Sequence, residues 1–515
     1  MRANSFPCHK MQAVKKYARK VNFPCKLFLH RAKVFSNMEV MTRSIPFAVA
    51  AFALALVVHA KKPNVLFIFA DDQCFETVGA LGLTDIETPN LDRLMKEGTT
   101  FTRAYNMGSW SGAVCVASRH MLNTGRFLWH ANEASKKAED ERAAGRFWSE
   151  NMKQAGYDTY FTGKWHVRAK AEKCFDVARN VRGGMPNQTP AGYNRPLPGK
   201  PDPWSPFDPK FGGFWKGGKH WSEVVGDDGI YFLDLAKKSE KPFFAYVAFN
   251  APHDPRQAPK EFVDKYPLKR IEVPKNFLPM YPYKDKIGCS HSLRDEKLGP
   301  MPRTEHSIKV NRQEYYAIIT HMDVQIGRIL DQLEKSGLGK ETYVFFSADH
   351  GLGVGHHGLF GKQNLYEHST RVPFIVSGPD VPKGKKVAAP IYLQDVMASS
   401  LEIAGVEKPE HVQFNSVMSL ARGETKKSSY NAIYGAYLSL QRSVTVKDKK
   451  LLLYPNVPVA RLYDVAADPM EMKDLAKDDA NKALMRKLFA RLLKLQKETG
   501  DKLDLKITFP DLAKK

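Results

Sequence analysis

The chain has 515 residues, of which 43% are hydrophobic and 26% charged, and its formal net charge is +23. This balance is typical of a folded globular protein and excludes a disordered or low-complexity chain. Six cysteines are too few for a disulfide framework, which leaves open a single bridge among Cys74, Cys115, Cys174 and Cys289.

The first sixty residues are not expected to belong to the folded protein. Residues 41–60 have a basic start, an apolar run and small residues at the end, the pattern of a secretory signal peptide cleaved after Ala60. Residues 1–40 precede this pattern, so we expect an upstream mis-start, with translation beginning at Met38 or Met41. A retained membrane anchor is the alternative, but the apolar run is short for a span. The sequence therefore predicts a secreted or periplasmic protein without stable membrane insertion.

The charge of the mature chain indicates the kind of partner. Residues 1–60 carry ten Lys or Arg and one Glu, so the rest of the chain keeps a net charge of +14. Basic surfaces attract polyanions. For an exported protein we expect a sulfated or carboxylated polysaccharide rather than nucleic acid, because the sequence contains no zinc-finger or RNA-binding motif. A solvated basic surface without a partner is the alternative.

Buried strands alternate with helices over residues 61–424, the predicted catalytic domain. Strands are expected at 64–70, 157–162, 243–249, 342–347 and 372–376, and helices at 89–97, 146–155, 318–333 and 394–404. Thr88 is the expected N-cap of one helix, with Pro89 in its first turn and Gly98 at its end. This alternation predicts an α/β fold with a mostly parallel central sheet covered by helices.

The segment 185–221 is rich in Pro, Gly and Trp, which predicts a long irregular excursion over the surface. Its aromatic residues are Trp204, Phe207, Phe211, Phe214, Trp215 and Trp221. They either line a sugar-binding cleft or form a small core under the loop.

A different pattern follows the polar linker at 423–429. Short strands are expected near 432–437, 442–446, 451–454 and 461–465, at the spacing of a meander. Residues 481–497 form a basic amphipathic helix. We therefore expect a C-terminal subdomain, 425–515, in which this helix covers a small antiparallel sheet; a role at a membrane surface is the alternative.

Polar side chains follow four of the predicted strands at the point where each strand ends. They are Asp71 and Asp72, Lys164 and His166, His253, and Asp349 and His350. Because the carboxyl ends of parallel strands meet at one edge, we expect these residues to converge there with Cys115. Converging carboxylates favour a hard divalent cation, while Lys164, Lys362 and Arg119 supply positive charge for an anionic substrate. Each feature alone has a structural interpretation, a solvated loop or a hydrogen-bonded histidine; the combination is more specific.

From about Pro63 to the C-terminal helix the chain resembles the type I sulfatases of the alkaline phosphatase superfamily. The matching stretches are PNVLFIFADDQ (63–73), TPNLDRL (88–94), CVASR (115–119), TGR (124–126), GKWH (163–166), FNAPH (249–253), ADHG (348–351), LYDV (462–465) and DP (468–469). The resemblance implies an alkaline phosphatase-like fold and hydrolysis of sulfate monoesters on a sulfated poly- or oligosaccharide. The family pattern at the nucleophile is Cys or Ser, any residue, Pro or Ala, any residue, Arg. Ala117 stands where Pro is commoner, which leaves open which formylglycine-generating maturation enzyme acts.

In this family the cysteine is oxidised to formylglycine, an aldehyde that hydrates to a geminal diol, and the resemblance implies the same for Cys115. One hydroxyl would attack sulfur, and the other would then expel sulfate as the aldehyde re-forms. The resemblance assigns one divalent cation, calcium, to Asp71, Asp72, Asp349, His350 and the modified Cys115.

The resemblance also assigns roles around the nucleophile. Arg119 would hold the hydrate, and Lys164 and Lys362 would bind the sulfate oxygens. His166 is the expected base for release of sulfate. His253 is the expected general acid to the leaving alcohol, either alone or together with Lys362.

Two other functions stay open at this point. A phosphonate or phosphodiester hydrolase would use the same fold and aldehyde, and a non-catalytic sulfoglycan-binding protein would result if Cys115 were unmodified. His356 and His357 either contact the sugar or are structural. Arg168 and Trp110 lie near the motifs in sequence, and the sequence assigns them no role.

Overall fold

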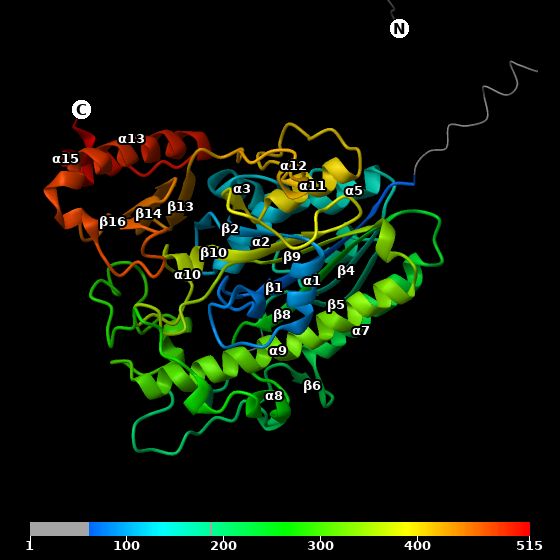
Figure 1. Ribbon diagram of the computed structural model, residues 1–515, viewed down its shortest axis with the longest axis horizontal. Helices are drawn as coiled ribbons and strands as arrows, with labels where there is room; N and C mark the ends of the chain where they lie inside the picture. Colours follow the sequence, from blue (N-terminus) through cyan, green and yellow to red (C-terminus); the bar gives the residue numbers. More distant parts are fainter. Residues whose placement is uncertain (1–60, 186–187, 515) are drawn as a thin grey trace, which may run out of the picture. The chain divides into compact units, whose positions relative to one another are not determined.

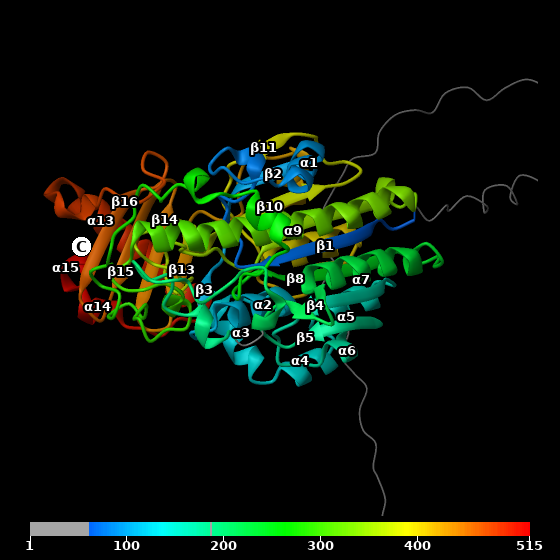
Figure 2. The same cartoon turned by 90° about the horizontal axis from the view of Figure 1, so that it is seen from below.

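The computed structural model describes residues 61–185 and 188–514, so the expected signal peptide at 41–60 and the segment 1–40 lie outside the described residues. Figures 1 and 2 show a larger and a smaller sheet. The strands of the larger sheet are β1 (Asn64–Asp71), β2 (Thr99–Tyr105), β4 (Asp158–Lys164), β5 (Val177–Arg182), β8 (Phe243–Pro252), β9 (Thr342–Ala348), β10 (Arg371–Ser377), β11 (Lys385–Val387) and β12 (Ile391–Tyr392). Their order is β11-β2-β10-β9-β1-β8-β4-β5, with β12 also paired to β2.

The middle of the larger sheet is parallel. Strands β5, β4, β8, β1 and β9 run in the same direction, whereas β10 is antiparallel to both of its neighbours. Every residue of β1, β8 and β9 is buried, because helices cover both faces and leave no polar side to the strands. The predicted mostly parallel, helix-covered sheet is confirmed, with β10 as the main exception.

Helices lie on both faces of this sheet. On one face are α7 (Trp221–Ala236), α8 (Lys260–Asp264) and α9 (Glu305–Lys335), and on the other are α2 (Val114–Thr124), α5 (Trp148–Gln154) and α11 (Asp395–Ile403) (Figure 1). The buried Trp148 ring of α5 packs 5.2 Å from Phe67 of β1 and 4.7 Å from Phe244 of β8, between ring centroids. Its indole N–H donates to the Ser400 hydroxyl of α11 at 2.7 Å, so one side chain joins the sheet to two helices.

Helix α1 (Pro89–Glu97) begins and ends where the sequence predicts, but its cap comes from elsewhere in the chain. Thr88 is the N-cap residue, yet its hydroxyl bonds the Asp92 carboxylate at 3.0 Å instead of a helix N–H. The carboxylate of Asp323, on α9, accepts from the N–H groups of Asn90 at 3.0 Å and Leu91 at 2.8 Å. The free N–H groups in the first turn of α1 are therefore hydrogen-bonded by a residue from a distant segment, and no local sequence motif predicts this contact.

The irregular segment 185–221 packs part of its aromatic surface inward. Trp204, Phe214 and Trp221 are buried, and Phe214 and Trp221 belong to the main hydrophobic core. Phe207, in contrast, is 38% exposed. Trp204, Phe214 and Trp221 are therefore packing residues, and these three rings do not line a sugar-binding cleft.

The smaller sheet contains β3 (Gly108–Ser109), β13 (Ile433–Tyr437), β14 (Gln441–Val446), β15 (Lys449–Tyr454) and β16 (Val459–Asp464), in the order β16-β15-β14-β13-β3. Strands β13 to β16 form the predicted antiparallel meander. Helix α13 (Lys482–Thr499) covers the sheet through buried leucines such as Leu488 and Leu492, as the amphipathic pattern predicts. Among the described residues no helix is both long enough and apolar enough to cross a bilayer.

Strand β3 connects the small sheet to the first half of the chain. It lies parallel to β13, with the Leu438 N–H donating to the Ser109 carbonyl at 2.9 Å. The small sheet therefore uses residues from outside the predicted subdomain, and the boundary between residues 424 and 425 stays a prediction. Gly108 makes this pairing possible, because a Cβ there would lie 1.9 Å from the Ala436 carbonyl oxygen and the backbone has φ +102°.

We expect Gly108→Ala to destabilise the protein more than Gly82→Ala. Gly82 also has positive φ, but nothing lies within 4 Å of its Cβ position, so its replacement costs only the backbone strain of about 1 kcal/mol. Gly108→Ala adds a clash with backbone that cannot move without separating β3 from β13. Urea unfolding of both variants measures the difference in the free energy of unfolding. Equal losses of this free energy would contradict the proposed steric role of Gly108.

Candidate active site

Four parallel strands bring the predicted polar residues to one edge of the larger sheet. Asp71 ends β1 and Lys164 ends β4, while His253 follows β8 and Asp349 follows β9. Cys115 is the second residue of α2, whose first turn lies at the same edge. Residues that are far apart in the sequence thus form one buried cluster.

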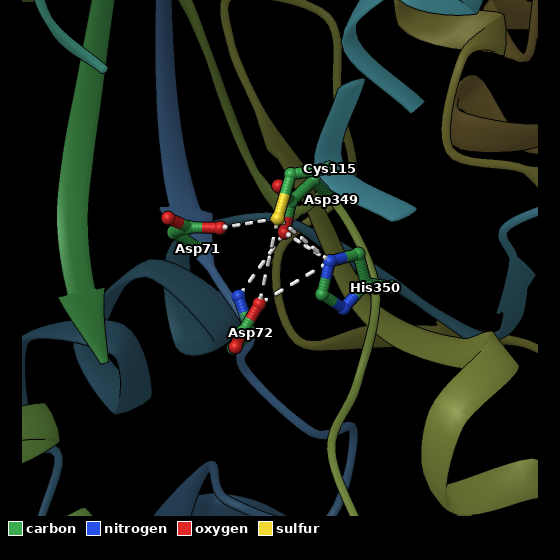
Figure 3. Close-up of side chains that lie close together, drawn as sticks. All are labelled: Asp71, Asp72, Cys115, Asp349 and His350. Carbon is green, nitrogen blue, oxygen red and sulfur yellow. Dashed lines mark hydrogen bonds and ion pairs between the residues drawn. The ribbon is translucent and has the colours of Figure 1, made fainter. Parts of the chain in front are cut away.

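Five of these side chains could hold a metal ion: Asp71, Asp72, Cys115, Asp349 and His350. All are buried, and one ligand atom of each lies within 4.8 Å of the others. Figure 3 shows the Cys115 sulfur pointing into the group. It lies 3.4 Å from Asp71 Oδ1 and 3.2 Å from His350 Nε2.

Cationic side chains hold the outer oxygens of the three carboxylates. Lys164 forms an ion pair with Asp71 Oδ2, which leaves Asp71 Oδ1 facing Cys115. Arg119 Nε bonds Asp349 Oδ2 at 3.2 Å. The Lys362 ammonium lies 2.8 Å from Asp72 Oδ2 and 2.9 Å from Oδ1.

The donor set fits one hard divalent cation. The Nδ1 atom of His350 lies 2.9 Å from the Gly351 carbonyl oxygen, and this contact orients the ring so that Nε2 faces the carboxylates. In the neutral ring, Nε2 would offer its lone pair to a cation. Burial and the neighbouring Asp71 raise the pKa of the Asp349 carboxyl to about 8. Three carboxylates in one buried volume disfavour one another's ionisation, and a cation among them would remove that penalty.

The surroundings of Cys115 favour an anion. Although burial opposes ionisation, Lys164 and Lys362 lower the pKa of its thiol well below the ordinary value. Arg119 is fully buried, and its Nη2 has no hydrogen-bond partner among the described residues. An oxygen on the Cys115 side chain would therefore find an unused donor. His166 is half-buried near Cys115, and burial lowers the pKa of its imidazole.

His253 lies between two carboxylates. Its Nε2 is 3.8 Å from Asp72, and its Nδ1 is 2.7 Å from the Asp254 carbonyl oxygen and 3.0 Å from that residue's carboxylate. Burial lowers the pKa of the imidazole, but Asp72 and Asp254 outweigh this effect and raise it to about 10. Arg294 in turn holds Asp254 at 2.6 Å.

Sequence reasoning missed two carboxylates of the site. Asp254 directly follows His253, and a search for acidic neighbours of the candidate histidines would have found it. Asp295, 3.7 Å from the Lys362 ammonium and 2.8 Å from the Gln363 amide, lies in an irregular region where no pattern singles it out.

Other candidates lie outside the cluster. His356 is buried between Glu76 at 3.0 Å and Asn276 at 2.9 Å, and the His357 ring stacks on Tyr366 with centroids 4.1 Å apart. Both histidines thus contact other parts of the protein and lie outside the metal-binding cluster. Cys74, Cys115, Cys174 and Cys289 are free, so no disulfide forms among the described residues.

A mostly parallel sheet with a buried acidic cluster and a helix-borne cysteine at its carboxyl edge is the arrangement of an alkaline phosphatase-like hydrolase. The family model described as Sulfatase matches residues 63–406, and that of the N-sulphoglucosamine sulphohydrolase C-terminal region matches residues 355–498. The chain belongs to the sulfatase family of sulfuric ester hydrolases, as the sequence motifs indicate.

Individual relatives agree with this assignment. A sulfatase of Formosa agariphila is 29% identical over 463 residues, covering 83% of this chain and 87% of that protein. An N-acetylglucosamine-6-O-sulfatase of Bacteroides thetaiotaomicron is 25% identical over 545 residues, covering 90% and 92%. The phosphonate monoester hydrolase structure of Agrobacterium radiobacter shares the fold with a TM-score of 0.66 at 18% identity, covering 85% of this chain and 96% of that one.

We expect Asp349→Asn to abolish stabilisation by Ca²⁺ while changing the stability of the cation-free protein little. The substitution replaces a carboxyl that keeps its proton near neutral pH by a neutral group of the same shape, but it removes a ligand. The measurement is the melting temperature with and without added Ca²⁺.

Asp323→Asn is the matched control, because Asp323 is also buried but caps α1 away from the cluster. It should lower the melting temperature equally with and without Ca²⁺, by loss of a backbone hydrogen bond. If Ca²⁺ stabilised Asp349→Asn as strongly as the unmodified sequence, Asp349 would not be a ligand.

Proposed function

We propose that this sulfatase hydrolyses sulfate monoesters on a sulfated carbohydrate, through a formylglycine made from Cys115. The observation that carries the proposal is the position of Cys115 at the start of α2, among three carboxylates and two lysines. The N-acetylglucosamine-6-O-sulfatase relative supports a sugar as the leaving group. The expected signal peptide makes export to the periplasm or the medium part of the proposal.

The surroundings of Cys115 suit an oxygen nucleophile better than a thiol. Carboxylates bind hard cations, and such cations activate oxygen ligands rather than sulfur. We propose that a maturation enzyme converts the side chain to the aldehyde, which would give Arg119 Nη2, an ion-pair partner of Asp71 at 3.9 Å, the hydrogen-bond acceptor that it lacks. When hydrated, formylglycine supplies a hydroxyl nucleophile and a route for releasing sulfate without a stable sulfate ester.

The proposed cation is Ca²⁺, held by Asp71, Asp72, Asp349, His350 and the modified Cys115. When bound, it supplies positive charge that favours ionisation of a hydroxyl near it. Arg119 orients the hydrated side chain through Nη2, which has no hydrogen-bond partner among the described residues. These assignments rest on the donor set and on the match to the family motifs.

Two lysines and two histidines complete the site. The Lys362 ammonium lies 3.6 Å from the Cys115 sulfur, and Lys164 lies on the other side, next to Asp71. Both would bind sulfate oxygens and balance the charge that grows during transfer. The neighbouring carboxylates keep His253 protonated, so that it can donate a proton to the leaving alcohol oxygen. His166 accepts a proton when sulfate is released.

A phosphonate or phosphodiester hydrolase is the second candidate, because the Agrobacterium radiobacter enzyme shares the fold. Assays of sulfate and phosphonate esters on one preparation distinguish the two. A non-catalytic sulfoglycan-binding role would require unmodified Cys115.

Peptide mass spectrometry across residues 114–119 tests the modification. Conversion of the thiol to the aldehyde lowers the residue mass by about 18 units. We expect this loss in active protein, together with loss of sulfatase activity in Cys115→Ala. Hydrolysis by Cys115→Ala at an unchanged rate would overturn the nucleophile assignment.

The role of His253 is tested by the leaving group. We expect His253→Ala to lower kcat/KM on a sugar sulfate by about a hundredfold or more, since an alkoxide leaves poorly without a proton. The loss on 4-nitrophenyl sulfate should be much smaller, because nitrophenolate needs no proton. Asp254→Asn should show the same pattern to a smaller extent, since Asp254 orients and charges the imidazole.

Lys164→Ala is the control for this experiment. It removes a contact to the sulfate, which both substrates share, so kcat/KM should fall by a similar factor on each. Equal losses in His253→Ala on both substrates would exclude a general-acid role.

A further inference from the structure

A groove of about 610 Å³ is lined in part by Trp110, in the loop that leads to Cys115, and has no role in the reaction described above. Its walls are α3 (Leu128–Ser135), the turn between β13 and β14, and the segment after α13. The side chains that matter for the argument are Trp110, Trp129, His130, Arg442, Asp501 and Lys502. This volume is within the range of sites for small organic ligands.

Trp110 joins the groove to the segment of the chain that carries Cys115. The residue stands five positions before Cys115 in the loop that leads to α2, and its partly exposed ring lines the groove. On the opposite side its ring meets that of His120, with centroids 6.1 Å apart. His120 accepts from the N–H of Arg168, in the segment just beyond His166.

A second connection runs through the small sheet. Gln441, next to the groove residue Arg442, donates to the Gln363 carbonyl at 2.8 Å, and Gln363 directly follows Lys362. The Gln363 amide donates to the Gly112 carbonyl at 3.1 Å, in the same loop as Trp110. Residues 110–114 therefore lead from the groove to Cys115, and a hydrogen bond holds this loop to the residue that follows Lys362.

The floor of the groove is rigid before any ligand binds. The buried Arg442 guanidinium forms a bidentate pair with Asp501, at 2.6 and 2.8 Å, and lies 5.1 Å from the centroid of the Trp129 ring. The indole N–H of Trp129 donates to the Tyr434 hydroxyl at 2.9 Å, and that hydroxyl donates to Asp501 at 2.8 Å. A ring fixed in this way offers an aromatic surface without an ordering cost on binding.

The charges at the rim favour an anion. Glu133 pairs with Lys136 at 2.7 Å, and Asp501 is neutralised by Arg442. Lys502 is exposed and adds a second positive charge near Glu133, since Lys136 and Lys502 both lower the pKa of that carboxyl. A second hollow shares His130 and Glu133 with the groove, so the surface continues away from the active site.

We propose that this groove binds a sugar ring next to the one that is desulfated, in a sulfated oligosaccharide. The apolar faces of a pyranose suit the tryptophan rings, and Lys502 suits a sulfate or carboxylate on that ring. The inference rests on the proposed carbohydrate substrate and deepens it: the enzyme acts on chains and prefers them to single sugars.

The test compares a tetrasaccharide with a monosaccharide that carries the same sulfated residue. We expect the unmodified sequence to have the higher kcat/KM on the tetrasaccharide. Trp110→Ala and Trp129→Ala should each lower that value about tenfold, the typical effect of removing an aromatic anchor. Values for the monosaccharide and for 4-nitrophenyl sulfate should change less than about twofold, since neither reaches the groove.

Two control variants separate the groove from general surface effects. Tyr231→Ala removes an aromatic ring that is 40% exposed on α7, away from the groove, and should leave both substrates unchanged. Lys502→Glu should weaken the tetrasaccharide alone, whereas Lys494→Glu, on the exposed side of α13, should not. Equal effects of Trp110→Ala and Trp129→Ala on all three substrates would overturn the proposal.

Binding to the Cys115→Ser protein, measured by titration calorimetry, distinguishes failure of the groove from failure of the proposed function. Hydrolysis of a sulfated sugar combined with tetrasaccharide binding that is unchanged by Trp110→Ala would overturn the groove and leave the function intact. Tetrasaccharide binding that depends on both tryptophans, without hydrolysis of any sulfated sugar, would overturn the function and support the groove.

Discussion

Three buried carboxylates in one small volume are the constraint on which this structure depends. Asp71, Asp72 and Asp349 cannot all be ionised there unless positive charge lies close by. Lys164, Lys362 and Arg119 supply that charge, yet Asp71 and Asp349 still turn one oxygen toward Cys115 or His350. The positive and negative side chains thus balance in charge, while carboxylate oxygens still face the centre of the cluster, where a cation would bind.

The parallel sheet makes this concentration of charge possible. Strands β1 and β9 are neighbours, so Asp71 and Asp349 follow adjacent strand ends, and β4 brings Lys164 to the same edge. The apolar strands behind them anchor the site, because β1 and β9 are buried along their whole length. Burial of so much apolar surface offsets the cost of holding the polar groups out of water.

The small sheet contributes to the site although it lies outside the main sheet. Its strand β3 leads directly into the loop before Cys115, and Gln441 of β14 holds the backbone next to Lys362. Replacement of the C-terminal region would therefore alter the position of groups in the candidate active site. The groove at Trp110 and Trp129 lies where the small sheet meets the loop before Cys115.

Much of the fold could be read from local patterns. Continuous apolar runs identified β1, β8 and β9, and the polar residues after them had to meet once the strands were parallel. Strands β2, β3 and β5 carried no such pattern, because β2 and β5 contain several polar residues and β3 has only two residues. Asp295 and Arg294 were not predicted either, because they reach the site from an irregular segment.

The sequence by itself determined the α/β class, the family and the identity of the residues at the strand ends, because hydrophobic periodicity and short motifs are local properties. Only the tertiary structure decided which oxygen of each carboxylate faces the cluster, that Asp254 backs His253, and that Asp323 caps a helix far away in sequence. Such contacts depend on three-dimensional packing between segments, and no spacing along the chain records them.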